Sequence, residues 1–271
     1  MDISITTIQM NSSPKVEDNL VWLTQQFSQI QGQGHKLVIL PECFACFGGS
    51  DQASSQIAED YDNGPVQKFL AHNAKKYGLW IVGGSLPIKN KDSDLFSAAC
   101  FLFSPDGQIQ ARYNKVHLFD ADVADKTKQY RESEITLAGN KVVVVDTPFA
   151  KIALAICYDV RFPELFRLMQ LEEPDIICIP SAFTYVTGCA HWETLMRARA
   201  IENQCFVAAA NQTGQHENGR QTFGHSMVID PWGEIIHQHA EQPGLIESSI
   251  HLSKIAQVRT KMPNLQHRQF K

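Results

Sequence analysis

Three side chains with useful chemistry stand at or near the ends of short apolar segments of the sequence. Cys157 closes the run KIALAIC, Glu42 closes KLVILPE, and Lys115 follows the segment 99–109 in ARYNKVHLF. A thiol can attack an electrophilic carbon, a partly desolvated carboxylate can take up the thiol proton, and an ammonium group can stabilise negative charge that develops on oxygen. Glu132, in RESEITLAGN, precedes the strand that leads to Cys157 and is, taken alone, an ordinary loop residue.

The neighbours of Cys157 predict that it lies where a strand turns into a helix. Asp159 can cap a helix, and Pro163 suits its first turn. A thiol at this position faces the positive end of the helix, which favours thiolate over thiol. Taken singly, a cysteine that closes an apolar strand is more often a buried apolar side chain, and Glu42 and Lys115 also fit solvated positions. Each residue alone therefore leaves both interpretations open.

Rival motifs in the sequence are incomplete. The Cys-x-x-Cys at 43–46 has no second pair and no nearby ligand histidine, so a zinc or redox site is not expected there. The Gly-x-Gly at 32–34 lacks a third glycine and precedes a strand, which argues against dinucleotide binding. The His-Gln-His at 237–239 has no third ligand at a convincing spacing and is better explained as an exposed strand. Neither a GxSxG elbow nor a P-loop is present.

Short apolar runs alternate with amphipathic segments along the whole chain. Apolar runs bounded by Gly, Pro or Asp predict strands at 3–10, 36–42, 79–86, 99–107, 141–148, 151–158, 175–181, 206–212 and 225–233. The amphipathic segments predict helices at 16–31, 65–77, 163–171 and 191–204. Ligands of such βα units gather beyond the carboxyl ends of the strands. The residues that directly follow each strand are therefore the ones that should face a substrate.

The two halves of the chain repeat three landmarks in the same order. KLVILPECF at 36–44 resembles DIICIPSAF at 175–183, GLWIVGGS at 78–85 resembles CFVAAANQ at 205–212, and LFSPDGQI at 102–109 resembles VIDPWGEI at 228–235. This order predicts two similar α/β halves that pack sheet against sheet.

Composition excludes several classes of protein. The 271 residues carry a formal charge of −5, which gives no electrostatic basis for binding nucleic acid or an anionic membrane. No apolar run approaches the length of a membrane span, and no secretory signal is visible at the start of the sequence. Seven cysteines are an odd number, and four lie in or beside apolar runs, which is typical of free thiols in a reducing cytoplasm.

Taken together, the order strand–Glu42, strand–turn–Lys115, loop–Glu132, strand–Cys157 resembles the nitrilase superfamily of carbon–nitrogen hydrolases. The resemblance extends over almost the entire chain, through LPECF, YNKVHLF, RESEITLAGN, ICYDVRFPEL, RARAIENQ and GHSMVIDPWGEI. It implies one domain over residues 1–271, folded as a four-layer αββα sandwich of two pseudo-symmetric halves. It also implies a homodimer or higher homo-oligomer that associates through helices next to the site.

The resemblance assigns a role to each residue of the set. Cys157 is the nucleophile, Glu42 the general base and acid, and Lys115 the oxyanion partner together with the backbone N–H of Tyr158. Glu132 holds Lys115 and the substrate nitrogen in register. The implied enzyme is a hydrolase of linear amides that forms an acyl-thioester and needs no metal or organic cofactor. A non-catalytic binding member of the fold is the alternative from another class.

The segments PSAFTYVTGCAHWE, GHSMVIDPWGEI and PNLQHRQF most resemble the metabolite-repair branch that cleaves deaminated glutathione into 2-oxoglutarate and Cys-Gly. The nearest alternative is an ω-amidase acting on 2-oxoglutaramate, followed by a nitrilase or an N-carbamoyl amidohydrolase. Arg197 and Arg199 are candidates for holding the substrate carboxylate, although a helix-face or interface role suits them better. The residues expected to bind substrate are Tyr158, Arg161, Ser181, Phe183, His216 and Arg220.

Overall fold

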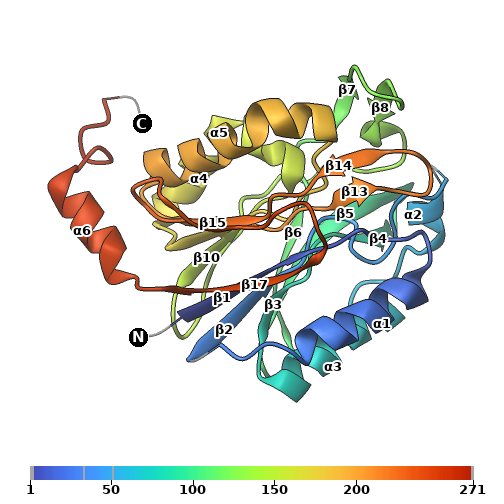
Figure 1. The fold of residues 1–271 in the computed structure, drawn as a ribbon, viewed down its shortest axis with the longest axis horizontal. Helices are drawn as coiled ribbons and strands as arrows, with labels where there is room; N and C mark the ends of the chain where they lie inside the picture. Colours follow the sequence, from blue (N-terminus) through green and yellow to red (C-terminus); the bar gives the residue numbers. More distant parts are fainter. Residues whose placement is uncertain (1–2, 33, 51, 270–271) are drawn as a thin grey trace.

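Two β-sheets pack face to face in the computed structural model, which describes residues 3–32, 34–50 and 52–269. Helices cover the outer face of each sheet, so the layers follow the order α, β, β, α (Figure 1). This arrangement confirms the four-layer sandwich expected from the sequence. Phe270, which ends the motif PNLQHRQF, lies outside the described residues.

The first half of the chain builds one sheet and its two covering helices. Its elements are β1 (Ile3–Gln9), α1 (Val16–Phe27), β2 (His35–Ile39), α2 (Ala53–Gln56), α3 (Pro65–Tyr77), β3 (Trp80–Val82), β4 (Leu86–Asn90), β5 (Ser93–Phe103) and β6 (Ile109–Asn114). A small hairpin of β7 (Asp120–Asp122) and β8 (Gln129–Arg131) then projects from the body of the molecule, and the 3-10 turn η1 (Glu132–Glu134) follows it (Figure 1).

The second half builds the other sheet. Its elements are β9 (Val144–Asp146), β10 (Lys151–Leu154), the 3-10 turn η2 (Cys157–Arg161), α4 (Pro163–Met169), η3 (Gln170–Glu172), β11 (Ile176–Cys178), α5 (Tyr185–Asn203), β12 (Phe206–Ala209), β13 (Thr213–Gln215), β14 (Gln221–Phe223), β15 (Met227–Ile229) and β16 (Ile235–Gln238). The chain then returns to the first sheet as β17 (Gly244–Ile250), which pairs with β1, and continues into α6 (Ser253–Lys261).

The two sheets have equivalent topologies, as the repeated landmarks predict. In the first sheet, β1, β2 and β3 are parallel neighbours, and β5 and then β6 extend it in antiparallel pairing. In the second, β10, β11 and β12 are parallel neighbours, and β15 and then β16 extend it in the same way. The repeated landmarks therefore occupy equivalent places: β2 with β11, β3 with β12, and the β5–β6 turn with the β15–β16 turn.

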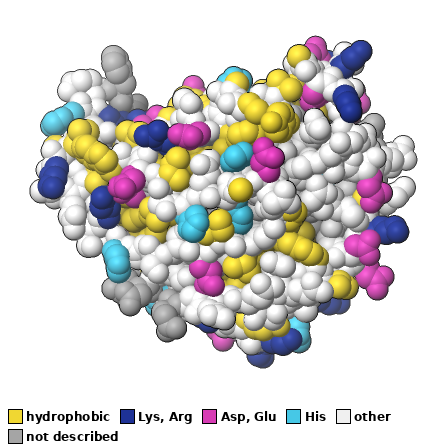
Figure 2. Space-filling view, viewed as in Figure 1, with side chains coloured by type: hydrophobic (Ala, Val, Ile, Leu, Met, Phe, Trp, Pro, Cys, Tyr) yellow, Lys and Arg dark blue, Asp and Glu magenta, His cyan; other side chains and the backbone are white. Residues whose placement is uncertain are grey.

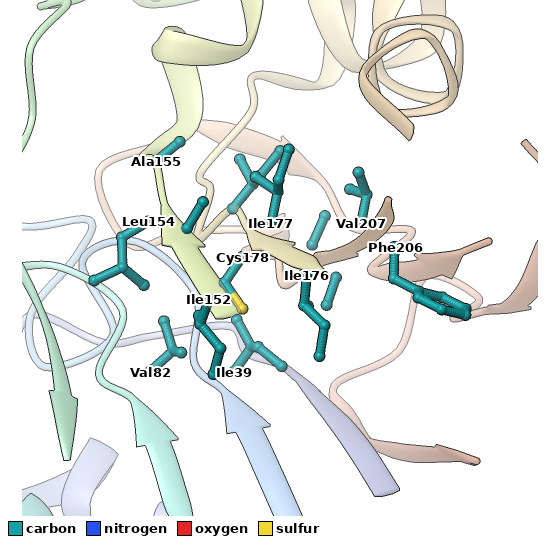
Figure 3. Packing of buried hydrophobic residues seen from close by; sticks show 14 of the residues in the cluster. Ile39, Val82, Ile152, Leu154, Ala155, Ile176, Ile177, Cys178, Phe206 and Val207 are labelled. Carbon is teal, nitrogen blue, oxygen red and sulfur yellow. The ribbon is translucent and has the colours of Figure 1, made fainter. Parts of the chain in front are cut away.

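Alternation of side chains along the strands explains why both faces of each sheet are buried. In β2, Leu37 and Ile39 belong to the apolar cluster between the sheets, whereas Val38 belongs to the cluster beneath α1 and α3. Successive side chains of a strand point to opposite faces, so a continuous apolar run suits a strand covered on both sides. Figure 3 shows Ile39 and Val82 of the first sheet facing Ile152 of the second.

Local details differ from the sequence expectations. Helix α5 begins at Tyr185, six residues before the expected start, because Thr184 serves as its N-cap and its hydroxyl accepts a hydrogen bond from the backbone N–H of Thr187. The strand expected at 79–86 ends at Val82, since Gly84 adopts a left-handed conformation with a φ of 54°. Within the described part of the chain, no helix is long and apolar enough to cross a membrane.

Candidate active site

Cys157 lies at the turn between β10 and α4, as its neighbours predict. Its backbone has a left-handed φ of 47°, and its N–H donates to the carbonyl oxygen of Pro180 at 2.8 Å. A positive φ at a residue other than glycine is strained, and such strain is found preferentially at functional sites. The charge of Glu42 and the backbone of Ala182 both act on the pKa of the thiol, Glu42 raising it and Ala182 lowering it.

The expectation of a thiolate at rest is wrong. Burial raises the pKa of the Cys157 thiol well above its usual range, and the negative charge of Glu42 raises it further, while the charge of Lys115 offsets only part of the shift. Only a single 3-10 turn and a two-turn helix follow Cys157, and a helix terminus contributes at most about 2 kcal/mol. Desolvation outweighs this contribution, so the resting site holds a neutral thiol beside a carboxylate that can take its proton.

Glu42, Lys115 and Glu132 form one connected ionic cluster beside Cys157. Lys115 Nζ lies 2.7 Å from Glu42 Oε1 and 2.8 Å from Glu132 Oε2, and its side chain is only 2 % exposed. The backbone N–H of Phe119 also donates to Glu132 Oε2, at 2.6 Å. The second carboxylate therefore ties the lysine to the loop that carries the β7–β8 hairpin.

The charge of Lys115 follows from its two partners. Burial alone lowers the pKa of this amine, but the carboxylates of Glu132 and Glu42 outweigh it, so the pKa is raised well above its usual range. Lys115 stays protonated and can face negative charge on a substrate oxygen. Burial raises the pKa of the Glu132 carboxyl group, and the lysine charge offsets part of this shift.

The main chain around Glu42 is held from both halves of the molecule. Glu42 directly follows Pro41 at the end of the β2 run, and its carbonyl oxygen accepts a hydrogen bond of 3.0 Å from Gln212 Nε2, beyond the end of β12. The Gln212 amide also donates to Ser12 Oγ at 2.8 Å. Both glutamine and serine are buried, so the position of the base depends on contacts between equivalent edges of the two sheets.

A cavity of about 420 Å³ opens beside Cys157. All four members of the set line it: Cys157, Glu42, Lys115 and Glu132. Of the residues expected to bind substrate, it is lined by Tyr158, Arg161, Phe183 and Arg220. The structure thus gathers eight of the ten expected site residues around one opening, although they come from segments far apart in the sequence.

Two expected substrate-binding residues lie outside this cavity. Ser181 is fully buried, and its hydroxyl donates to the carbonyl oxygen of Ile179 at 3.2 Å. His216 is 3 % exposed, with Nδ1 lying 3.2 Å from the Ser12 carbonyl oxygen and Nε2 lying 2.7 Å from Thr222 Oγ1. Burial lowers the pKa of His216 to about 4. The predictions for both are wrong, because the protein interior already uses their polar atoms.

The two arginines considered for the substrate carboxylate, Arg197 and Arg199, do not line the cavity. Arg199 is buried and donates from Nε to the carbonyl oxygen of Val160 at 2.9 Å. Arg197 donates from Nε to the carbonyl oxygen of Gly233 at 2.9 Å. Both therefore hold helix α5 against its neighbours, which agrees with the helix-face interpretation.

The sequence predictions missed one wall of the cavity. Phe119 directly precedes β7, Tyr130 lies in β8, and the centroids of their rings are 5.0 Å apart. Tyr130 also lies under the guanidinium of Arg220, at 5.2 Å from its ring centroid. The sequence did contain a signal for this wall: two aromatic residues stand in an otherwise polar, charged segment, and exposed loops rarely need aromatic side chains. Cys43 lines the cavity too, and burial raises the pKa of its thiol.

Among the described residues, no group of three or more histidine, cysteine, aspartate and glutamate side chains is placed to hold a metal ion. The cluster of Cys157, Glu42, Lys115 and Glu132 instead combines a nucleophile, a proton acceptor and a buried cation. Such a set can attack a carbonyl carbon, carry the proton to a leaving group, and stabilise the oxyanion between these steps.

Comparisons with known proteins agree with this chemistry. Residues 4–260 match the family model described as carbon-nitrogen hydrolase. A deaminated glutathione amidase of Yersinia enterocolitica is 40% identical, over 98% of this chain and 93% of that protein. An omega-amidase of Danio rerio is 36% identical, over 96% of this chain and 92% of its own. A solved structure from Saccharomyces cerevisiae, titled a member of branch 10 of the nitrilase superfamily, has a TM-score of 0.87 and 30% identity, over 99% of this chain and 97% of that one.

Proposed function

Because the chain belongs to the carbon–nitrogen hydrolase family, we propose that Cys157 hydrolyses a linear amide through an acyl-thioester. Cys157 Sγ bonds to the amide carbon while the thiol proton passes to Glu42. The carbon–nitrogen bond then breaks, and Glu42 returns this proton to the leaving amine. In the second half-reaction Glu42 takes a proton from water, the water oxygen attacks the thioester, and the carbon–sulfur bond breaks as the thiol regains its proton. One water is consumed, and a carboxylic acid and an amine are released.

The observation that carries this proposal is the position of the Glu42 carboxyl group. It lies 2.7 Å from Lys115 Nζ, and its charge raises the pKa of the Cys157 thiol, inside a cavity that all three residues line. A binding protein has no use for a base placed between a nucleophile and a buried cation. We assign Lys115 and the backbone N–H of Tyr158 to the oxyanion, and Glu132 to holding Lys115 in place.

The substrate we propose is deaminated glutathione, cleaved to 2-oxoglutarate and Cys-Gly. A relative with that printed name is 40% identical to this chain, whereas the omega-amidase relative is 36% identical. Both activities transfer the same 2-oxoglutaryl group to Cys157, so they differ in the leaving group. Arg220, which lines the cavity beside Tyr130, is the cation we assign to the terminal carboxylate of the dipeptide.

Arg161 is the residue we assign to the carboxylate of the acyl half. It lines the cavity, and its guanidinium lies 5.1 Å from the ring centroid of Phe183 and 5.8 Å from that of Tyr158. Its Nη1 also lies 3.1 Å from His191 Nδ1. Contacts with aromatic faces restrict the guanidinium, which keeps its planar donors available for a carboxylate.

A competition between the two amides tests the substrate. We expect kcat/KM for deaminated glutathione to exceed that for 2-oxoglutaramate at least about 10-fold, a difference of about 1.4 kcal/mol. Arg220→Ala should narrow this gap by weakening the tripeptide, whereas Arg197→Ala, outside the cavity, should leave the ratio unchanged. A preference of the native enzyme for 2-oxoglutaramate overturns the substrate, and an unchanged ratio in Arg220→Ala removes Arg220 from the proposal.

A homodimer formed through the α5 face and a cytoplasmic location complete the proposal. Figure 2 shows exposed hydrophobic side chains over helix α5, where Tyr185, Val186 and Ile201 are each more than 40% exposed. Light scattering should give twice the chain mass, and Ile201→Glu should lower the measured mass toward that of the monomer. A native monomer at all concentrations contradicts the dimer.

The cytoplasmic location rests on the cysteines. All seven are free thiols, which is typical of a reducing compartment.

A further inference from the structure

Asp159, two residues after the nucleophile, is fully buried and accepts four hydrogen bonds. Its Oδ1 accepts from the backbone N–H of His117 at 3.0 Å and lies 2.8 Å from His117 Nδ1. Its Oδ2 accepts from the hydroxyl of Tyr113 at 2.7 Å and from the backbone N–H of Ile156 at 2.9 Å. Two oxygens of a carboxylate offer about four acceptor positions, so this side chain is fully used.

The donors come from the two segments that carry the reacting groups. Tyr113 and His117 stand two residues on either side of Lys115, which directly follows β6. Ile156 directly precedes Cys157, and Asp159 itself belongs to the turn that begins there. One carboxylate therefore joins the main chain around the cation to the main chain around the nucleophile.

We propose that Asp159 is a positioning residue, which fixes the distance between Lys115 Nζ and Cys157 Sγ through both half-reactions. The inference rests on the proposed function of the site. Asp159 is fully buried and does not line the cavity, so it can act on the reacting groups only through the two segments that it joins.

The surroundings of this network favour geometry that is held fixed. The His117 ring stacks on Phe162 with centroids 3.7 Å apart and planes 5° apart, so the ring cannot turn away from the carboxylate. Burial raises the pKa of Tyr113 well above its usual range, and the neighbouring carboxylate of Asp159 adds to this shift. Tyr113 therefore stays protonated near neutral pH, where its hydroxyl donates to Asp159. A displacement of about 1 Å between reacting groups can cost about 10²-fold in rate.

Asp159→Asn is the test variant, because it keeps the shape of the side chain and replaces one acceptor oxygen by an NH₂ group. In either orientation that group faces a backbone N–H, of Ile156 or of His117, so this hydrogen bond is lost and a buried donor is left unpaired. The matched control is Asp230→Asn, at another buried aspartate, whose Oδ1 accepts from the backbone N–H groups of Trp232 and Glu234 in the β15–β16 turn. Both variants should lower the melting temperature by similar amounts.

The deciding measurements are kcat and KM for whichever of the two amides the native enzyme hydrolyses faster. Each kcat is divided by the fraction of Cys157 that iodoacetamide alkylates, which gives kcat per reactive thiol and corrects for misfolded protein. We expect Asp159→Asn to lose at least about 100-fold in kcat per reactive thiol, with KM within about threefold of the native value, while Asp230→Asn keeps its kcat. A kcat per reactive thiol within threefold of native in Asp159→Asn overturns the inference.

Two milder variants and one assay without substrate complete the test. Tyr113→Phe and His117→Phe each remove one side-chain donor and keep an aromatic ring, so they report on the network even when Asp159→Asn does not fold. Each should lower kcat about tenfold; native kcat in both contradicts the inference. If the native enzyme hydrolyses neither amide, the proposed substrate is wrong. The role of Asp159 is then tested by the rate at which iodoacetamide alkylates Cys157. That rate should fall at least tenfold in Asp159→Asn if Lys115 moves away from the thiol.

Discussion

At the scale of residues, the proposed mechanism depends on transfer of the Cys157 thiol proton to Glu42. Burial and the carboxylate raise the pKa of the thiol, so the sulfur stays protonated until a substrate carbonyl is present. Lys115, held by two carboxylates, keeps its charge and is therefore suited to the oxyanion role that we propose for it. In this proposal the nucleophilic thiolate forms only within the reaction, and a neutral thiol in a cavity reacts more slowly with unwanted electrophiles.

Cys157→Ala should abolish turnover and leave the protein folded, because the change removes the attacking atom and very little volume. Steady-state kcat and the melting temperature measure these two effects. Cys43→Ala and Cys46→Ala are the controls and should keep most of the activity, although both positions line the cavity. A tenth of native kcat in Cys157→Ala means that another residue is the nucleophile.

Glu42→Gln should lower kcat by about 10³ or more, which corresponds to about 4 kcal/mol of barrier. The amide cannot accept the thiol proton, return it to the leaving amine, or activate water, so both half-reactions suffer. Single-turnover mass spectrometry measures formation and loss of the acyl group on Cys157 separately. Substantial turnover in this variant would move the base to Glu132, which shares Lys115 with Glu42.

At the scale of elements, the site depends on how closely the ends of neighbouring strands approach. Gly84 follows β3 with a φ of 54°, and a Cβ atom at this position would collide with the carbonyl oxygen of Pro41, the residue before Glu42. The same turn gives the Ser85 hydroxyl, which accepts from the backbone N–H of Cys43 at 2.9 Å. The glycine after β3 therefore sets the path of the chain that carries the base.

Gly84→Ala should lower both stability and kcat, and Gly78→Ala is its matched control. Gly78 ends α3 with a similar φ of 64°, but no atom lies within 4 Å of its added Cβ. We expect Gly78→Ala to cost about 1 kcal/mol of unfolding free energy with native kcat, and Gly84→Ala to cost more. Urea unfolding measures the loss of stability in each variant, and steady-state kinetics measures kcat. Equal losses in the two variants would contradict a role for the contact between residue 84 and Pro41.

At the scale of the whole molecule, two buried histidines sit where the halves of the chain meet. His216 bonds Ser12 and Thr222, and His239 Nε2 lies 3.1 Å from the carbonyl oxygen of Thr7 in β1. Burial lowers the pKa of each imidazole to about 4. Both rings are therefore neutral at physiological pH and stabilise the contact between segments far apart in the sequence.

Acidification should destabilise the fold between pH 6.5 and 4. The unfolded chain takes up a proton at each of these histidines near pH 6.5, whereas the folded chain does so only near pH 4. The stabilisation that the two residues contribute is therefore lost as the pH falls from 6.5 to 4, and they cause no further loss below pH 4. Each residue accounts for about 3 kcal/mol at most. His216→Gln and His239→Gln should each flatten the slope of unfolding free energy against pH, whereas His72→Gln, on the exposed face of α3, should not. Parallel slopes in all variants would contradict this assignment.

The sequence by itself determined the central strands of both sheets and most helices, because apolar periodicity is a local feature, and the order of Glu42, Lys115, Glu132 and Cys157 along the chain identified the cluster through its resemblance to a family. The strands at the edges of the sheets and in the hairpins, such as β4, β7 and β17, were not predicted. The tertiary structure decides which residues come into contact, because Lys115 and Glu42 are 73 positions apart in the sequence and Gln212 and Glu42 are 170 apart. Only the packing of the two sheets decided that His216 and Ser181 are buried, that Arg161 and Arg220 reach the cavity, and that Cys157 rests as a thiol. Burial and the field of neighbouring charges depend on everything that surrounds a group, and residue type and spacing along the chain do not contain that information.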